Sequence, residues 1–421
     1  MNTHLQAVRG MNDIVPPMSA AWREFEATVA ALLTSYGYGE IRMPLVEQSA
    51  VFKRSIGDAT DIVQKEMYTF DDRNGDSLTL RPEGTAGCVR AVLQNGLLQH
   101  TPLRLWYSGP MFRHERPQRG RHRQFHQIGV EAFGAAGPDI DAEVILMTAR
   151  LWRALGIGNL RLEMNSLGSG AVRARYRETL SAYFRDQFDA LDQDSRERLE
   201  RNPLRILDSK NPTMSKLIAG APSLAEHLDD ESHAHFETLC GMLAANGVEV
   251  HRNPRLVRGL DYYSKTVFEW ITSELGAQGT VCAGGRYDAL VELMGGKPTP
   301  AIGFAMGVER LLELRAAHGP ASNAPAVYIS ATGEHLDAEA VKLAEMLRGR
   351  LPGKQIVLHV GGGSLKSRMK KADKSGAMLA LLLGEDEMAS GTVTLKPLRG
   401  DGPQTTHPRD EVAAVLEVHC R

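Results

Sequence analysis

Residues 107–133 read YSGPMFRHERPQRGRHRQFHQIGVEAF, and both ends of this segment alternate in the manner of β-strands. Between the two ends, five arginines fall within eleven residues: Arg113, Arg116, Arg119, Arg121 and Arg123. The whole chain has a formal net charge of −2, so this local excess of positive charge indicates an anionic ligand. Because arginine offers planar, paired donors that suit phosphate oxygens, the segment predicts a hairpin that binds a phosphate-bearing molecule.

The alternation divides the predicted hairpin into two faces, because residues two apart on a strand point the same way. One face collects Tyr107, Met111, Arg113 and Glu115 from the first strand and Phe125, Gln127, Gly129 and Glu131 from the second. The other face carries His126, Ile128, Val130 and Ala132. An exposed, salt-bridged hairpin is the alternative, but it explains neither the arginine excess nor the glycine in the polar row. We therefore interpret the polar face as a ligand-binding surface.

Length and composition set the class of protein. The 421 residues are 43% hydrophobic and 24% charged, which is ordinary for a globular chain of two or three domains. Four dispersed cysteines (Cys88, Cys240, Cys282 and Cys420) suit neither a zinc ribbon nor a disulfide framework, so we expect a cytoplasmic protein. Neither a signal-peptide core nor a run of about 18 apolar residues occurs, so no membrane contact is expected.

Strands and helices are mixed without βαβ regularity, which predicts an antiparallel α+β core. We expect a helix at 19–36, a strand at 41–45 interrupted by Pro44, and strands at 67–70 and 77–80. RPEGTAG, residues 81–87, then opens a helix that runs through Val92. Residues 170–250 show helical spacing among many charges and are predicted to be a helical insertion. The strand-rich pattern returns at 256–272, and a glycine-rich stretch, 276–307, leads into a helix from Val308.

A second domain is predicted beyond a boundary at residues 319–325. There the apolar runs AVYISA, QIVLHV and AMLALLL alternate with helical segments, which is typical of an α/β domain. We assign residues 1–322 to the first domain, insertion included, and residues 325–421 to the second.

Three short motifs outside the hairpin are candidates for chemistry. In RPEGT, residues 81–85, Glu83 could hold a cation such as an α-ammonium group, or could serve only the dipole of the following helix. In GFAMGVER, residues 303–310, Arg310 opposes the dipole of the helix it opens, which favours phosphate binding over a structural role.

The third motif, RGLDYY at residues 258–263, places an arginine beside a glycine, where it can approach a polyphosphate closely. A buried arginine–aspartate pair with two core tyrosines is the alternative. If this segment heads a strand, Arg258 and Tyr262 share one face and Tyr263 takes the other. Only a bulge or a twist would then bring all three into one pocket.

Together these segments resemble the class II aminoacyl-tRNA synthetases, and among them the bacterial histidyl-tRNA synthetase family. The three class motifs occur in order, as the helix with its Pro44 strand, FRHERPQRGRHRQFHQ at 112–127, and GFAMGVER. RGLDYY and AGGRYD (283–288) resemble the histidine signatures, and SLKSRMKKADKSGAMLALLLGEDE (364–387) resembles the anticodon-binding domain. His122 stands where the family often has tyrosine or phenylalanine.

The resemblance implies a class II catalytic core and a histidine–tRNA ligase that uses ATP and Mg²⁺, binds L-histidine and tRNA(His), and forms a homodimer. It implies Arg113 and Arg258 as catalytic residues. Histidine binding is expected from Glu83, Thr85, Arg113, Gln127, Glu131, Arg258, Tyr262, Tyr263 and Tyr287, with Glu131 and Tyr263 bracketing the imidazole. ATP binding is expected from Arg113, Glu115, Arg121, Arg123, Phe125 and Arg310. Contact with tRNA is expected from Arg116, Gln118, Arg119, Lys366, Lys370 and Lys374, and no residue is assigned as a metal ligand.

Three alternatives compete with this interpretation. The regulatory subunit of ATP phosphoribosyltransferase, a histidine-sensing paralogue, generally lacks the C-terminal domain and has eroded motifs. A class II synthetase for another amino acid would need other pocket signatures. A plain RNA-binding scaffold would suit the lysines, which could also form a merely solvated helix face, but it leaves the pocket motifs unexplained.

Overall fold

The computed structural model describes residues 5–57, 60–207, 209, 211–258, 260, 262–276, 279–316 and 324–419. The chain divides into two compact units, Met1–Pro320 and Ala321–Arg421. None of the described helices is long and apolar enough to cross a bilayer.

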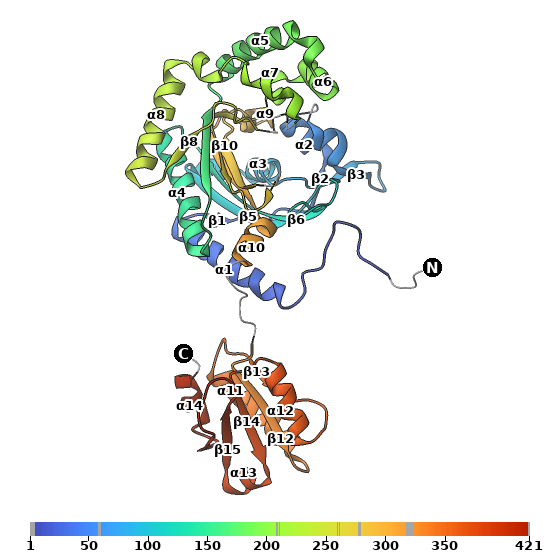
Figure 1. Cartoon of the computed structure of the whole chain (residues 1–421), viewed down its shortest axis with the longest axis vertical. Coiled ribbons are helices and arrows are strands. Elements are labelled where there is room, and N and C mark those ends of the chain that lie inside the picture. The colour runs from blue at the N-terminus through green and yellow to red at the C-terminus, as the bar shows by residue number, and fades with distance from the viewer. Residues whose placement is uncertain are drawn as a thin grey trace. The chain divides into compact units, whose positions relative to one another are not determined.

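An eight-stranded sheet forms the centre of the first unit (Figure 1), in the order β1-β5-β6-β11-β10-β9-β7-β8. The strands are β1 (Gly39–Glu40), β5 (Leu103–Phe112), β6 (Gln124–Phe133), β7 (Arg161–Ser166), β8 (Val250–Arg252), β9 (Ser264–Ile271), β10 (Thr280–Arg286) and β11 (Ala301–Gly307). All pairings from β5 to β7 are antiparallel, and the two outermost pairings are parallel. The predicted antiparallel α+β core is confirmed.

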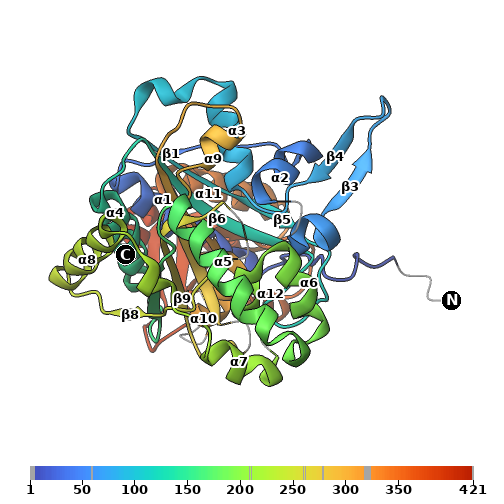
Figure 2. The same ribbon diagram turned by 90° about the horizontal axis from the view of Figure 1, so that it is seen from above.

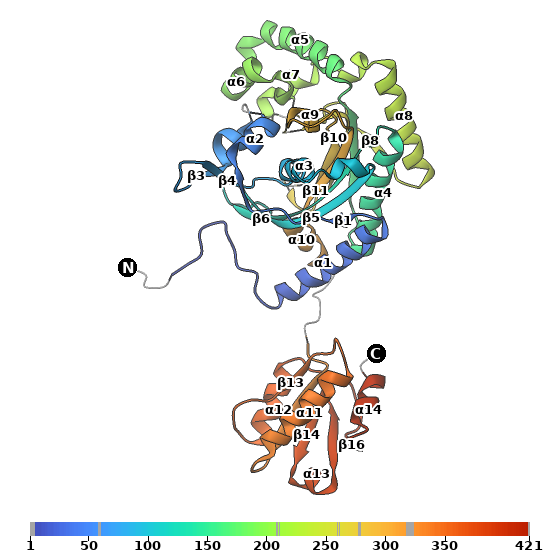
Figure 3. The ribbon, with the colours of Figure 1, turned by 180° about the vertical axis from the view of Figure 1, so that it is seen from behind.

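The predicted hairpin is the β5–β6 pair, which runs in register from Leu103 opposite Phe133 to Phe112 opposite Gln124. Its apolar side chains, including Ile128 and Val130, enter a core shared with the helices on one side of the sheet. Figure 3 shows α1 on that side and α3 within the concave opposite side. The bounds are α1 (Met18–Ser35), α3 (Thr85–Gln94), α4 (Pro138–Leu155) and α10 (Val308–Ala316). The division into an apolar and a polar face is therefore confirmed.

The strand expected at residues 41–45 is absent from the described structure. β1 ends at Glu40 and β2 begins at Val46, and the backbone between them forms no continuous ladder of hydrogen bonds with a neighbouring strand. Pro44 lacks an N–H and restricts the residue before it, which explains the break. A separate three-stranded sheet follows, in the order β2-β4-β3, made of β2 (Val46–Gln48), β3 (Tyr68–Asp71) and β4 (Ser77–Leu80).

The insertion is helical, as predicted. Its main helices are α5 (Gly170–Asp186), α6 (Gln193–Arg201), α7 (Ser215–Ala219) and α8 (Asp230–Ala245). Figure 2 shows α5, α6 and α7 gathered together beside the sheet. Two shorter helices, α2 (Ser49–Ile56) and α9 (Leu290–Leu293), complete the unit with several single turns.

The second unit is an α/β fold around a five-stranded sheet, in the order β13-β12-β14-β15-β16. The first three strands are parallel and the last two pairings are antiparallel. The strands are β12 (Val327–Thr332), β13 (Ile356–Leu358), β14 (Leu379–Gly384), β15 (Thr392–Pro397) and β16 (Thr405–Pro408). The helices are α11 (Leu336–Arg350), α12 (Leu365–Lys374), α13 (Glu385–Ser390) and α14 (Val412–His419).

Candidate active site

A pocket of about 310 Å³ opens on the polar face of the main sheet. Most of the predicted site residues line it: Glu83, Thr85, Arg113, Glu115, Arg121, Phe125, Gln127, Arg258, Tyr262, Tyr263, Tyr287 and Arg310. These residues come from the hairpin, the start of α3, the segment before β9, the end of β10 and the start of α10. The structure thus brings together side chains that are more than 200 positions apart in the sequence.

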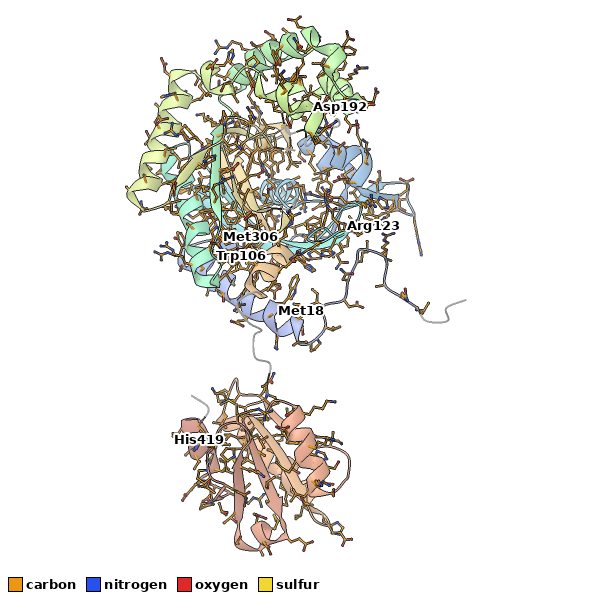
Figure 4. The ribbon with its side chains drawn as sticks, in the orientation of Figure 1. Met18, Trp106, Arg123, Asp192, Met306 and His419 are labelled. Atoms are coloured by element: carbon orange, nitrogen blue, oxygen red, sulfur yellow. The ribbon has the colours of Figure 1, made fainter. Side chains whose placement is uncertain are left out.

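Two of the residues predicted to bind histidine or ATP lie outside the pocket lining. Arg123 is at the start of the returning strand, where Figure 4 labels it, and its backbone N–H donates to the Gly10 carbonyl (2.8 Å). Glu131 lies beneath the pocket and is completely buried.

Glu131 is held by three hydroxyl groups from three elements. Its Oε1 accepts hydrogen bonds from the Thr85 hydroxyl (2.8 Å) and the Tyr107 hydroxyl (3.1 Å). Its Oε2 accepts one from the Tyr287 hydroxyl. Removal from water raises the pKa of the Glu131 carboxyl to about 8, although the three hydroxyl groups favour the ionised form.

This raised pKa predicts that stability falls as the pH rises from the unfolded toward the folded pKa, from about 4.5 to about 8. The folded protein holds the Glu131 proton more tightly than the unfolded chain, whose carboxyl has the ordinary value of 4.5. The resulting stability is fully present below the unfolded pKa and is lost as the pH rises through the folded value. We expect the melting temperature of the wild type to fall between about pH 5 and about pH 8 by more than that of Glu131→Gln. Equal changes in the melting temperatures of the two proteins over this pH range would contradict the raised pKa of Glu131.

Glu83 caps helix α3 as well as lining the pocket. Its two carboxylate oxygens accept hydrogen bonds from the backbone N–H groups of Thr85 (2.6 Å) and Ala86 (2.8 Å). Burial raises the pKa of Glu83, and the two backbone hydrogen bonds oppose that rise. The sequence left a helix-terminal role and a cation-binding role open. The structure shows the first, and the position in the lining is compatible with the second.

The two arginines predicted to be catalytic come from segments that are far apart in the sequence. The Arg113 Nε donates to the Pro82 carbonyl (2.9 Å), and its guanidinium lies 5.3 Å from the centre of the Phe125 ring. Arg258 forms an ion pair with Glu269 and lies 5.5 Å from the centre of the Tyr263 ring. Both guanidinium groups are therefore oriented by neighbours while remaining on the pocket wall.

The expectation that Tyr263 faces away from Arg258 and Tyr262 is wrong. β9 begins only at Ser264, so the preceding residues are not on a pleated strand and do not alternate between faces. All three side chains line the pocket, and the rings of Tyr262 and Tyr263 lie 4.8 Å apart. Residues 259 and 261 of this motif lie outside the described residues.

The loop between β5 and β6 is tied to α10. The Arg310 Nε donates to the Gly120 carbonyl (2.9 Å), and its Nη1 donates to the Thr280 carbonyl (2.6 Å). Arg119, predicted to meet tRNA, forms an ion pair with Glu313 of the same helix. Arg121 pairs with Glu115. Of the other predicted tRNA contacts in this loop, Arg116 is exposed, and Gln118 forms an isolated β-bridge with Arg121.

Arg286 of the AGGRYD segment is a structural residue that sequence reasoning missed. Its side chain is completely buried, forms an ion pair with the equally buried Asp141 (2.7 Å), and donates to the carbonyls of Ala135 and Gly137. Asp141 also accepts from the Thr266 hydroxyl (2.7 Å). The available signal was Asp141, one of two acidic residues in the otherwise apolar stretch 140–147.

In the second unit, the predicted basic residues lie on one helix. Lys366, Lys370 and Lys374 are exposed on α12, whereas Ala372 of the same helix is buried. The three side chains thus form an exposed cationic face.

Comparison with protein-family models gives two matches. The model described as histidyl-tRNA synthetase matches residues 10–311, and the model described as anticodon binding domain matches residues 326–419.

Solved structures give a similar picture. The chain is 33% identical to the apo histidyl-tRNA synthetase of S. aureus, with a TM-score of 0.83, and the match covers 98% of this chain and 100% of that one. A histidyl-tRNA synthetase from Nostoc sp. is 19% identical, with a TM-score of 0.73 and coverage of 99% and 100%. A Bacillus halodurans protein named as an ATP phosphoribosyltransferase regulatory subunit/histidyl-tRNA synthetase is 21% identical, with a TM-score of 0.66 and coverage of 91% and 99%. The last two likenesses concern the fold alone.

Proposed function

Because the chain belongs to the histidyl-tRNA synthetase family and is a histidine–tRNA ligase, we propose a task in that reaction for each part of its main pocket. In the first step the histidine carboxylate attacks the α-phosphate of ATP, which gives histidyl-adenylate and releases pyrophosphate. In the second step a terminal ribose hydroxyl of tRNA(His) attacks the acyl carbonyl and releases AMP. Both steps depend on positioning and charge stabilisation more than on a nucleophilic side chain.

The observation that carries the proposal is that Arg113, Arg258 and the Glu131 cluster meet around one pocket. Arg113 would hold the α-phosphate and the carboxylate of histidine. Arg258 would stabilise the negative charge that develops as the α-phosphate becomes pentacoordinate. Their planar guanidinium groups, already oriented by neighbours, reduce the reorganisation that the transition state requires.

In the same pocket, Glu131 and Tyr263 would bind the two imidazole nitrogens. An imidazole offers one donor and one acceptor, or two donors when protonated, and a carboxyl opposite a phenol can satisfy both nitrogens. Glu83, Thr85 and Gln127 would hold the α-ammonium group. Tyr262 and Tyr287, which line the pocket, would close the walls around the ring.

ATP would lie between the hairpin and α10. Phe125 would stack on adenine with Arg310 on its other side, and Arg121 would contact the outer phosphates. We also propose that ATP enters with Mg²⁺, which is usually held by one or two carboxylates together with substrate phosphates. Among the described residues no cluster of three or more potential metal ligands occurs, but Glu115 and Glu309 line the pocket and suit such a shared site. Mg²⁺ would neutralise phosphate charge.

We propose that the acceptor end of tRNA meets Arg116, Gln118 and Arg119 and that the exposed lysines of α12 contact another part of it. Replacing Lys366, Lys370 and Lys374 by alanine should raise the KM for tRNA several-fold, because each lost phosphate contact removes part of the counterion release. Histidine-dependent ATP–pyrophosphate exchange should stay unchanged, and added salt should weaken charging less in the variant than in the wild type. A double substitution of Lys342 and Lys354 in the same unit is the matched control. Unchanged tRNA kinetics in the triple variant would show a merely solvated face.

A cytoplasmic homodimer is the setting we propose for this activity. It rests on the family resemblance of the motif-one sequence, residues 19–45, and on free thiols at the described cysteines Cys88, Cys240 and Cys282.

The direct test is amino-acid-dependent ATP–pyrophosphate exchange with each of the twenty amino acids, in the presence of Mg²⁺ and without tRNA. We expect exchange with histidine alone. Exchange with a different amino acid would contradict the assignment of Glu131 and Tyr263. A folded protein that exchanges with none of them would support a histidine sensor or an RNA-binding scaffold instead.

A further inference from the structure

Tyr107 occupies a slot that two glycines from different segments keep open for it. Its ring is almost completely buried and passes between Gly84, just before α3, and Gly129 on β6. A methyl group at either glycine would overlap the Tyr107 ring. Two positions without side chains are thus needed to seat one tyrosine, which indicates that the ring's position matters beyond filling the core.

A third glycine clears space for the group that Tyr107 contacts. A methyl group at Gly303 would overlap the Oε2 atom of Glu131 and the Val130 carbonyl. Gly303 itself lines the pocket, so it separates Oε2 from the pocket without covering it by a side chain. The carboxyl of Glu131 therefore lies directly under a part of the wall that carries no side chain.

The three hydroxyl groups do not use every hydrogen-bond acceptor position of the Glu131 carboxylate. In its ionised form, which a ligand N–H donor favours, the Glu131 carboxylate can accept about four hydrogen bonds, two at each oxygen. Thr85 and Tyr107 fill both positions on Oε1, and Tyr287 fills one on Oε2. One position, on Oε2, remains for a ligand N–H.

We propose that Tyr107 is a positioning residue for the selection of histidine: with Thr85 it saturates Oε1 of Glu131, so that only Oε2 can accept the imidazole N–H. This inference rests on the proposed function. Tyr107 does not line the pocket and would act only through Glu131. Burial raises the pKa of Tyr107 well above its ordinary value, so the phenol stays a donor at neutral pH.

The test is Tyr107→Phe, which removes the hydroxyl but keeps the ring between the two glycines. Without this donor, Oε1 has a vacant position and the carboxyl can turn, so the KM for histidine in ATP–pyrophosphate exchange should rise about tenfold. The KM for ATP and kcat should change less than about twofold. Because the Tyr107 hydroxyl favours the ionised form of Glu131, the pH dependence of the histidine KM should also shift to higher pH.

Tyr176→Phe is the matched control, since it removes another buried tyrosine hydroxyl, one that donates to the Pro222 carbonyl (2.8 Å) in the insertion. Its kinetic constants should equal those of the wild type. Equal rises in the KM values for histidine and ATP, or an unchanged histidine KM and pH profile in folded Tyr107→Phe, would overturn the inference while leaving the proposed function intact. Absence of histidine-dependent exchange in the wild type would overturn both.

Discussion

Replacing Arg258 by methionine is expected to lower kcat for histidine-dependent ATP–pyrophosphate exchange about 10²–10³-fold, or about 3 kcal/mol of transition-state stabilisation. The side chain is 18% exposed and is already oriented by Glu269, so its charge is present before the reaction begins. Methionine has a similar length and no charge. Because the lost interaction forms with charge that develops during the reaction, kcat should fall more than the KM for ATP rises.

A second substitution separates this effect from a loss of stability. Arg258→Met alone leaves the Glu269 carboxylate, itself only 16% exposed, without its cation, which can cost about 3–5 kcal/mol of folding free energy. In Arg258→Met/Glu269→Gln this unpaired charge is removed, while Glu269→Gln alone keeps the arginine. We expect the rate loss in the double variant and only a small one in Glu269→Gln. A double variant with a wild-type melting temperature and a rate within about threefold of the wild type would contradict a role for Arg258 in charge stabilisation.

Glu131→Gln should reduce kcat/KM for histidine about 10²-fold or more and should leave the KM for ATP almost unchanged. The carboxylate of Glu131 has four acceptor positions, enough for the three hydroxyl donors around it and one ligand N–H. The amide of glutamine has only one oxygen, and its NH₂ group would face some of those donors. One buried donor then loses its partner, and the position left for imidazole on Oε2 is lost or replaced by a second donor.

Exchange kinetics with histidine and ATP varied separately measure this difference. Glu143→Gln, at a partly buried position of α4 beside Arg104, serves as a matched substitution outside the pocket lining. Equal losses for histidine and ATP in folded Glu131→Gln would contradict the assignment of Glu131 to the imidazole.

The polar face of the hairpin could be predicted because β5 and β6 pair without a bulge, so a period of two holds along both strands. The directions of the Arg258, Tyr262 and Tyr263 side chains could not be predicted from this period, because those residues precede the strand. The alternation of side chains between two faces applies only to residues that lie on a strand. The resemblance to a family supplied these residues, but only the structure showed that they share one wall.

Long-range partners account for the remaining differences. The Arg286–Asp141 pair joins residues 145 positions apart, and the two glycines around Tyr107 belong to different elements. No local pattern specifies such a pairing. A buried charge or a glycine in a strand can be noticed in the sequence, but the partner that explains it comes from the topology of the sheet.

The Gly10 carbonyl accepts hydrogen bonds from two successive backbone N–H groups at the start of β6, those of Arg123 (2.8 Å) and Gln124 (3.1 Å). Two residues further along, the Asn12 side chain contacts the His122 ring (3.2 Å). Residues 10–12 therefore act as a brace for the arginine-rich loop, although they belong to no helix or strand. A shortened chain that begins after residue 13 would keep every residue of the pocket lining and still lose this brace, so a boundary chosen from the pocket residues alone would release the arginine-rich loop.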